Sequence, residues 1–460
     1  MADGVGRWLP LSAEVFCIPL ESGDYLIYAP LRRSAFVANA ATVNLIADLG
    51  EGRHEESVDP GGSIMELLHH LGITGAGDEE RPLRTLRDEP APTSITLFLT
   101  TACNLRCTYC YASAGDTRQT FMPLDVAKRG IEFVASNAAR LQRKQFELMF
   151  HGGGEPALNW KTMTGAREHA REVGERLGLR VHASSATNGM LNDAQINWMI
   201  ANLAHATVSF DGLPQAHDMH RKTIDGKASS ARVMRTMHRF EAASFKYGLR
   251  MTVTADQIAL LPQSIAFICE NFQIKQFKVE PAYQLGRWAG APSAETTAFI
   301  DAYREAQAIA SAHGRKLVYS AARLDVLTTH FCGISRDSFC LTPDGNVSAC
   351  YETFAEESPW AKRFFYGRPN EGGGYEFDMN VLDTLRRQTV EHQPYCEGCF
   401  AKWHCAGDCH HKALDVSAGD AFAGSDRCHI TRELTKDQIL ARIEEAGGVF
   451  WRGNSLNGRV

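Results

Sequence analysis

The chain has 460 residues, a hydrophobic content of 44% and a formal net charge of −6 at pH 7. Its length exceeds what a single hydrophobic core usually serves, so two or three domains are expected. The slightly acidic balance excludes a generally basic surface, and nucleic acid is therefore not expected as a partner.

The cysteine content favours metal binding in a reducing compartment. The first residues carry no cationic region followed by an apolar stretch, and no later run approaches the roughly 18 apolar residues needed to span a bilayer. We therefore expect a cytoplasmic protein without membrane contact. Thirteen cysteines in such a protein favour metal ligation over disulfides, because the cytosol keeps thiols reduced.

Residues 1–76 are predicted to form a small, winged-helix-like α+β domain. Two alternating segments, residues 15–19 and 25–29, flank the turn Ser22-Gly23-Asp24 and predict a β-hairpin. Short amphipathic helices are expected near residues 40–49 and 63–71. The acidic, proline-containing residues 77–93 predict a linker.

Residues 94–315 show the alternation of strands and helices that is typical of a partial (β/α)6 barrel of the TIM type in the α/β class. Helices are expected to begin near residues 124, 160, 194, 230, 262 and 294. The carboxyl ends of the strands are where such folds place their chemistry. The six predicted strands are residues 95–99, 146–150, 180–184, 206–210, 249–254 and 277–280.

The pattern changes in residues 316–440, which contain eight cysteines among many turn residues. This region has little apolar periodicity with which to build a core, so its folding is expected to depend on bound metal. Residues 441–460 are expected to be a C-terminal tail.

The first cysteine cluster follows the first predicted barrel strand as Cys103-Asn-Leu-Arg-Cys107-Thr-Tyr-Cys110, a C-x3-C-x2-C triplet in a loop. Three thiolates leave one iron of a cubane cluster without a protein ligand, and open metal positions support catalysis. The amino and carboxylate groups of a methionine-derived ligand suit that position. The alternative is a zinc site, but zinc motifs usually supply ligands in separated pairs, and no fourth partner lies nearby.

The triplet resembles the signature of the radical S-adenosylmethionine (SAM) superfamily, whose members cleave the sulfonium of SAM to a 5′-deoxyadenosyl radical. The resemblance implies a [4Fe–4S] cluster on the three cysteines, with SAM at the open iron. It extends to a glycine-rich segment after the second strand, where glycines permit close backbone approach to the cofactor. The cofactor-binding residues implied here are Tyr109, Gly153, Gly154, Glu155, Pro156 and Asn188.

The end of the fourth strand adds to this resemblance. Ser209-Phe210-Asp211-Gly212, followed by Arg221, is similar to the S-x-D-G arrangement of the family and implies that Ser209, Asp211 and Arg221 contact the cofactor. An arginine fork suits the methionine carboxylate of SAM, although a surface loop is the commoner place for such an arginine. Glu280, at the end of the sixth strand, is a candidate catalytic residue that faces the cofactor or else orients a loop.

The order and spacing of the later cysteines resemble the SPASM extension of peptide-modifying radical SAM enzymes, a C-terminal iron-sulfur domain. The resemblance implies two auxiliary [4Fe–4S] clusters and hence three clusters in all. Zinc on the second set is the alternative. The first implied set is Cys332, Cys340, Cys350 and Cys409, and the second is Cys396, Cys399, Cys405 and Cys428.

The N-terminal hairpin and helices resemble the PqqD-like recognition element of enzymes that mature ribosomally made peptides. A leader peptide would add as a strand to the exposed edge of such a sheet. A cap that only buries barrel surface is the alternative.

The resemblances imply an enzyme that cleaves SAM reductively and abstracts a hydrogen atom from a residue of a precursor peptide with a leader segment. The product would be a carbon–carbon, thioether or other oxidative link, and an external flavodoxin or ferredoxin would supply the electron. Anaerobic sulfatase-maturating enzymes are an alternative, but they carry an aspartate where this chain has Tyr351, our second candidate catalytic residue. A peptide epimerase and a non-catalytic iron-sulfur carrier are further alternatives.

Overall fold

The computed structural model describes residues 7–10, 14–51, 63–74, 81–84, 86–116, 118–291, 293–414 and 424–451. The chain forms two compact units. The terminal unit contains residues 1–85, 321–331 and 389–460, and the barrel unit contains residues 86–320 and 332–388. The predicted borders at residues 76, 93, 315 and 440 stay a prediction.

The barrel unit is built on one sheet of 11 strands in the order β11-β10-β9-β8-β7-β6-β5-β12-β13-β14-β15. From β11 to β5 every neighbouring pair is parallel. The predicted parallel α/β sheet is therefore confirmed. Its first six strands are β5 (Ser94–Phe98), β6 (Gln145–His151), β7 (Arg180–Thr187), β8 (His205–Ser209), β9 (Tyr247–Val253) and β10 (Gln276–Pro281).

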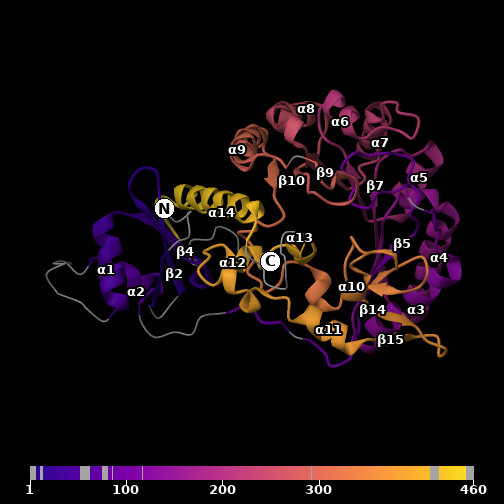
Figure 1. Ribbon diagram of the computed structural model, residues 1–460, viewed down its shortest axis with the longest axis horizontal. Helices are drawn as coiled ribbons and strands as arrows, with labels where there is room; N and C mark the ends of the chain where they lie inside the picture. Colours follow the sequence, from indigo (N-terminus) through magenta and orange to yellow (C-terminus); the bar gives the residue numbers. More distant parts are fainter. Residues whose placement is uncertain are drawn as a thin grey trace. The chain divides into compact units, whose positions relative to one another are not determined.

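Helices follow the strands one by one and lie around the outer side of the sheet (Figure 1). Strand residues alternate in burial because they face the helices and the inner side in turn. In β6, for example, Phe146, Leu148 and Phe150 are fully buried, whereas Glu147 is exposed. The short helix α6 was not predicted. The helices are α3 (Leu124–Arg140), α4 (Trp160–Leu177), α5 (Asp193–Asn202), α6 (Pro214–His220), α7 (Ser230–Ala242), α8 (Leu261–Asn271) and α9 (Thr296–Ala312).

The last strands of the barrel unit extend the sheet beyond β5. The glycine-rich residues 370–374 form the turn between β14 and β15, closed by the Asn370 N–H, which donates to the Gly374 carbonyl at 3.0 Å. Phe133 of α3 packs against Phe339 and Tyr375, which attaches this extension to the barrel helices. The elements are β11 (Lys316–Val318), β12 (Cys340–Leu341), β13 (Val347–Ser348), α10 (Ala361–Phe364), β14 (Phe365–Pro369), β15 (Tyr375–Phe377) and α11 (Met379–Arg386).

The terminal unit contains an antiparallel sheet in the order β1-β2-β3-β4-β16. Strands β2 and β3 form the expected hairpin. The fifth strand comes from the other end of the chain, within the part predicted as a tail. The strands are β1 (Arg7–Pro10), β2 (Glu14–Pro19), β3 (Tyr25–Ala29), β4 (Ser34–Ala38) and β16 (Val449–Phe450).

Both faces of this sheet are buried. Val15 and Ile27 pack on one face with residues of α1 (Ala40–Gly50) and α2 (Ser63–His70). Phe16 and Tyr28 pack on the other face with Phe400 and with Ile439 of α14 (Asp426–Glu445). The unit also holds α12 (Lys402–Cys405) and α13 (His410–Leu414).

Among the helices of the described residues, none is both long and apolar enough for a membrane crossing.

Candidate active site

The three cysteines of the triplet line one large cavity of the barrel unit. Cys103, Cys107 and Cys110 lie in the loop that follows β5, at the carboxyl end of the sheet. The cavity has a volume of about 1380 Å³. Common ligand pockets measure roughly 300–1,000 Å³, so this one has room for a cofactor and a substrate together.

The triplet loop is held in place by Arg287, which the sequence did not single out. Its Nη1 donates to the Cys107 carbonyl, its Nη2 to the Ala114 carbonyl at 3.0 Å and its Nε to Asp116 at 2.8 Å. The Arg287 N–H also donates to the Cys110 carbonyl at 3.0 Å. Arg287 thus fixes the backbone at the second cysteine through its side chain and at the third through its own backbone N–H.

The predicted glycine-rich segment lies against the same loop. A side chain at Gly154 would collide with the Ala102 carbonyl oxygen, and the Glu155 N–H donates to that same oxygen at 2.9 Å. Gly153, Gly154, Glu155 and Pro156 all line the cavity. Glycine at position 154 is therefore required by close backbone approach within the protein.

Glu155 is buried and connects this segment to the third predicted site. Its carboxylate accepts from the Asn188 N–H at 2.7 Å, the Thr187 hydroxyl at 3.0 Å and the Ala157 N–H at 3.2 Å. Burial raises its pKa to about 7, although these donors oppose the shift. The Glu155 carboxylate therefore positions the loops. The Asn188 Nδ2 donates toward the Cys103 sulfur at 3.6 Å.

Tyr109, Asp211 and Arg221 form a buried network. Arg221 donates Nε to Asp211 at 2.7 Å and Nη2 at 3.1 Å, and its guanidinium lies 5.1 Å from the centre of the Tyr109 ring. Asp211 also accepts from the Tyr109 hydroxyl and from the Thr252 N–H at 3.0 Å. All its oxygen positions are thus taken by protein donors.

Not all of the predicted cofactor residues in and around this network face the cavity. Tyr109, Ser209 and Arg221 line the cavity, whereas Asp211 does not and instead positions the other side chains. Burial opposes the charge on Asp211, but the Arg221 guanidinium holds its pKa below the usual range. The pair remains charged because each partner supplies the charge that the other needs when buried.

The two candidate catalytic residues lie in different places. Glu280 is buried outside the cavity lining and accepts from the Tyr283 hydroxyl at 2.8 Å and the Ser320 N–H at 2.9 Å, which fits the loop-orienting alternative. Tyr351 lines the cavity and stacks on His151, with ring centres 5.2 Å apart. Burial raises the pKa of Tyr351 to about 12 and lowers the pKa of His151 to about 4, so both are neutral at pH 7.

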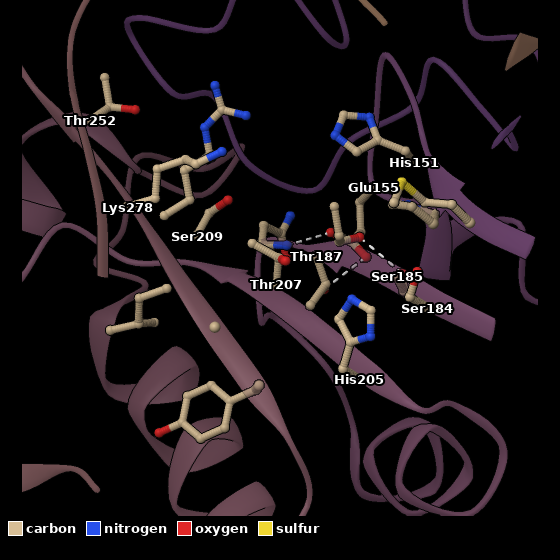
Figure 2. Close-up of a pocket in the computed structure, with 18 of the residues that line it drawn as sticks. His151, Glu155, Ser184, Ser185, Thr187, His205, Thr207, Ser209, Thr252 and Lys278 are labelled. Atoms are coloured by element: carbon tan, nitrogen blue, oxygen red, sulfur yellow. Dashed lines mark hydrogen bonds between the residues drawn. The ribbon is translucent and has the colours of Figure 1, made fainter. Parts of the chain in front are cut away.

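Several polar side chains line the inner wall of the cavity beyond the triplet. Figure 2 shows Ser184, Thr207, Ser209 and Lys278 around the same space as Glu155. These side chains come from the inward positions of β7, β8 and β10. A polar or charged substrate would find hydrogen-bonding partners among these side chains.

The second set of predicted cluster ligands comes together within the terminal unit. Cys396, Cys399, Cys405 and Cys428 line one small space of about 20 Å³. Burial raises the pKa of Cys396 to about 12, and the neighbouring cysteines add to that shift. Buried, clustered thiols with a raised pKa lose their protons readily only when a metal ion binds in place of the protons.

Charged side chains surround this second group. Lys402 and Arg432 line the same space, and Asp408 beside them is paired with Arg427, whose Nη2 donates to it at 2.7 Å. Two cations next to four thiolates would offset the negative charge of a cluster. Four cysteines in one space, with compensating cations, fit an iron-sulfur cluster.

The first implied auxiliary set is divided between the units. Cys332, Cys340 and Cys350 belong to the barrel unit and Cys409 to the terminal unit, so this set stays a prediction. Burial raises the pKa of the Cys340 thiol to about 12, and the nearby Cys332 adds to that shift.

Among the described residues, no three His, Cys, Asp or Glu side chains group as they would around a single metal ion. Cubane ligands each bind a different iron, so they need not converge on one point.

Comparison with known proteins identifies the domain that carries the triplet. Residues 97–263 match the Radical SAM superfamily. Fe-coproporphyrin III synthase of Methanosarcina barkeri is 28% identical over 167 residues, which are 36% of this chain and 38% of that enzyme. Pre-heme d1 synthase of Dinoroseobacter shibae is 23% identical over 390 residues, which are 77% of this chain and 90% of that enzyme. The chain spans only 38%, 57% and 37% of the length of the first three curated relatives.

Two solved structures share the fold. The structure of native anSMEcpe with bound AdoMet superposes with a TM-score of 0.62 at 17% identity, covering 76% of this chain and 99% of that one. Streptococcus suis SuiB bound to precursor peptide SuiA gives a TM-score of 0.50 at 11% identity, covering 91% of this chain and 99% of that one.

Proposed function

We propose that this chain, whose residues 97–263 form a radical SAM domain, is a SPASM-type enzyme that oxidatively modifies a ribosomally made precursor peptide. Radical SAM enzymes use a [4Fe–4S] cluster and SAM. When bound here, these cofactors would supply a 5′-deoxyadenosyl radical that removes a hydrogen atom from the substrate. The product would contain a carbon–carbon, thioether or other carbon–heteroatom link.

One observation carries the proposal: three loop thiols, without a fourth protein ligand in their motif, line a cavity of about 1380 Å³ with polar side chains on its inner wall. A carrier would close the fourth position with protein and would need no such cavity. Cys103, Cys107 and Cys110 would hold the cluster. The size of the cavity leaves space for a peptide beside the cofactor.

The surrounding residues take defined parts in this proposal. Ser209 and Arg221 would bind the methionine carboxylate of SAM, since Arg221 lines the cavity while Asp211 fixes two of its nitrogens. Gly153 and Gly154 would allow the cofactor amino group close to the backbone. Arg287 would keep the cysteine loop in register with both.

Eight of the ten remaining cysteines would hold two auxiliary clusters with the ligand sets implied by the SPASM resemblance. The four cysteines of the second set line one space, which supports that assignment. A flavodoxin or ferredoxin would supply electrons. Eight irons beyond the catalytic cluster are therefore expected, about four per cubane.

The N-terminal sheet is the proposed site for the leader segment. Strand β16 pairs with the outer side of β4, so among the described strands the remaining edge of that sheet is β1. A leader adding to β1 would protect backbone amides there. Hydrogen exchange of the full chain with and without precursor peptide should protect residues 7–10 more than β4; equal exchange everywhere would favour a mere cap.

The first test is SAM cleavage. After anaerobic reconstitution, the protein is mixed with SAM and dithionite, and 5′-deoxyadenosine is measured by liquid chromatography. Steady production of 5′-deoxyadenosine supports the proposal. If SAM stays intact with fully iron-loaded protein, the alternative of a non-catalytic iron-sulfur carrier is favoured.

The second test concerns the substrate. A precursor peptide encoded beside the gene is incubated with the active enzyme and measured by mass spectrometry. A mass decrease of about two hydrogens indicates a cross-link, and tandem spectra locate it. If the peptide mass is unchanged, chiral analysis of its amino acids detects epimerisation. Formation of formylglycine in a sulfatase-derived peptide would identify the maturase alternative.

A second candidate is the modification of a tetrapyrrole. It is favoured by the relative named pre-heme d1 synthase, of which this chain covers 90%. The polar side chains of the inner wall suit the carboxylate side chains of a porphyrin as well as a peptide. Production of 5′-deoxyadenosine stimulated by a porphyrin and not by peptide would select this candidate.

A further inference from the structure

We infer that Glu14 is a positioning residue of the second cysteine group, which holds the helix that carries Cys405 and sets the charge beside the cluster proposed there. The inference rests on the proposed function and deepens it, because it gives the N-terminal sheet a part in a metal centre. The contacts that support it all lie within the terminal unit. The second cysteine group consists of Cys396, Cys399, Cys405 and Cys428.

The helix α12 lies between two of these four cysteines in the chain. It begins at Lys402, shortly after Cys399, and its last residue is Cys405. The Lys402 N–H donates to the Cys399 carbonyl at 3.1 Å, and the Cys405 N–H donates to the Ala401 carbonyl at 2.9 Å. A single helical turn is not stable by itself, so the position of Cys405 depends on what the side chains of α12 contact.

Glu14, the first residue of β2, binds two consecutive side chains of this helix. Its Oε2 lies 2.8 Å from the Lys402 Nζ, and its Oε1 accepts from the Trp403 indole N–H at 2.9 Å. The side chains of Glu14 and Lys402 are only 8% and 14% exposed. Buried charges need such partners, because an uncompensated charge away from water is unfavourable. The contact therefore fixes both side chains of α12.

Tyr28 of β3 holds the next residue of the helix. Its hydroxyl is hydrogen-bonded to the His404 Nε2, and the His404 Nδ1 lies 2.9 Å from the Val326 carbonyl oxygen. A carbonyl only accepts, so in a neutral ring Nδ1 donates to Val326 and Nε2 accepts from Tyr28. The three residues that precede Cys405 are thus all held by side chains of the N-terminal sheet.

Lys402 connects this contact to the cysteines, because it lines the same small space as the four thiols. The reduction potential of an iron-sulfur cluster depends on the net charge around it. A nearby cation favours the reduced cluster, which is the more negative form, and a nearby carboxylate disfavours it. Glu14 offsets part of the charge of Lys402 and therefore makes reduction less favourable.

The sheet that supplies Glu14 is also the sheet proposed to bind the leader segment. Strand β2 pairs with β1, and Glu14 is the register partner of Pro10. The proposed leader edge and the support of the cysteine helix are therefore neighbouring strands of one sheet.

The test measures a reduction potential, so it needs neither substrate nor SAM cleavage. Full-length C107A, expected to lack the catalytic cluster, is reconstituted anaerobically and titrated with dithionite, with electron paramagnetic resonance as the readout. The signal lost on adding C405A belongs to the second cysteine group. At the midpoint of the C107A parent, E14Q should raise the ratio of reduced to oxidised cluster about ten-fold, a shift of about +59 mV. K402Q should lower this ratio by a similar factor.

Matched variants separate this role from general effects. If Glu14 acts by holding Lys402, the shifts of E14Q and K402Q should not add in the double variant. E14D keeps the carboxylate and should restore most of the parent potential. E21Q removes an exposed carboxylate of the same unit, with the same change in net charge, and should leave the potential unchanged. Melting temperatures and near-ultraviolet circular dichroism check the fold of each variant.

An unchanged potential in E14Q, even with a lower melting temperature, would overturn the inference and leave Glu14 as structural support alone. Additive shifts would also overturn it, because Glu14 would then act independently of Lys402. If E14Q does not fold, K402Q decides, and an unchanged potential there has the same meaning. Zinc in place of iron would overturn it as well, because zinc has no redox chemistry.

The inference and the proposed function fail separately. If E14Q and K402Q shift the potential as expected but the wild-type protein cleaves no SAM, the proposed function fails and the role of Glu14 stands. If a peptide is modified while neither variant shifts the potential, the reverse is true.

Discussion

The cysteines of the barrel unit and those of the terminal unit differ in what surrounds them. Cys103, Cys107 and Cys110 lie on a loop that borders about 1380 Å³ of open cavity. Cys396, Cys399, Cys405 and Cys428 enclose about 20 Å³. Metal sites with a free position face a cavity and perform chemistry, whereas fully ligated sites are closed and stabilise the fold. The surroundings of the two cysteine groups therefore predict different roles for them.

The sharpest way to break this comparison is C107A. We expect 5′-deoxyadenosine to fall to background and about four irons per chain to be lost, while the melting temperature changes little. The control is C269A, which removes a buried thiol of α8 that no cluster is expected to use. Continued SAM cleavage by C107A would remove the triplet from the site.

The matching change in the closed group is C405A. Because metal binding there is expected to contribute folding energy, we predict a melting temperature about 10 °C lower, at roughly 2–4 °C per kcal/mol. Calorimetry and an iron assay check this, with C17A, a buried thiol in the same unit, as the control. If C405A and C107A lowered stability equally, the contrast between open and closed sites would not hold.

R287Q tests how the loop that carries Cys103, Cys107 and Cys110 is held in place. Losing the contacts to the Cys107 and Ala114 carbonyls and to Asp116 should loosen the cysteine loop and lower the rate of SAM cleavage about ten-fold, a loss of about 1.4 kcal/mol. Electron paramagnetic resonance of the reduced cluster should change shape as well. R167Q, which removes a similar arginine-to-carbonyl bond far from the loop, should leave both readouts unchanged.

A further prediction concerns the dependence of stability on pH. Burial lowers the pKa of His217 to about 4, below its ordinary 6.5. The unfolded chain therefore binds a proton more readily than the folded one, so the stabilisation is complete above pH 6.5 and is lost as pH falls toward 4. The advantage of wild type over H217Q in anaerobic chemical denaturation should shrink by about 3 kcal/mol across that window. A constant difference would contradict the buried neutral imidazole.

The barrel strands could be predicted because their side chains alternate between helices and cavity. All six predicted strands overlap the observed ones, and the cysteine triplet follows the first of them as expected. The resemblance to the SPASM extension also implied the set Cys396, Cys399, Cys405 and Cys428, and these four residues line one space. These features depend on neighbours in sequence, which a pattern records.

Other features depend on partners far apart in the chain. Nothing near Arg287 indicates that it fixes a loop about 180 residues earlier, and the motif around Asp211 does not tell that its oxygens are taken up by Arg221, Tyr109 and Thr252. The hydrogen bond between Glu14 and Trp403 joins residues 389 positions apart. Such roles follow from three-dimensional neighbours and not from local pattern.

The pairing of β16 with β4 has a consequence for how the protein is made and studied. Strand β16 leaves the ribosome some 400 residues after β4. In the same way, Phe16 and Tyr28 cannot pack against Phe400 and Ile439 until synthesis is nearly finished. Closing so long a loop costs entropy that only a large buried face offsets. An excised N-terminal fragment would expose that face and aggregate, so leader binding has to be measured on the intact polypeptide.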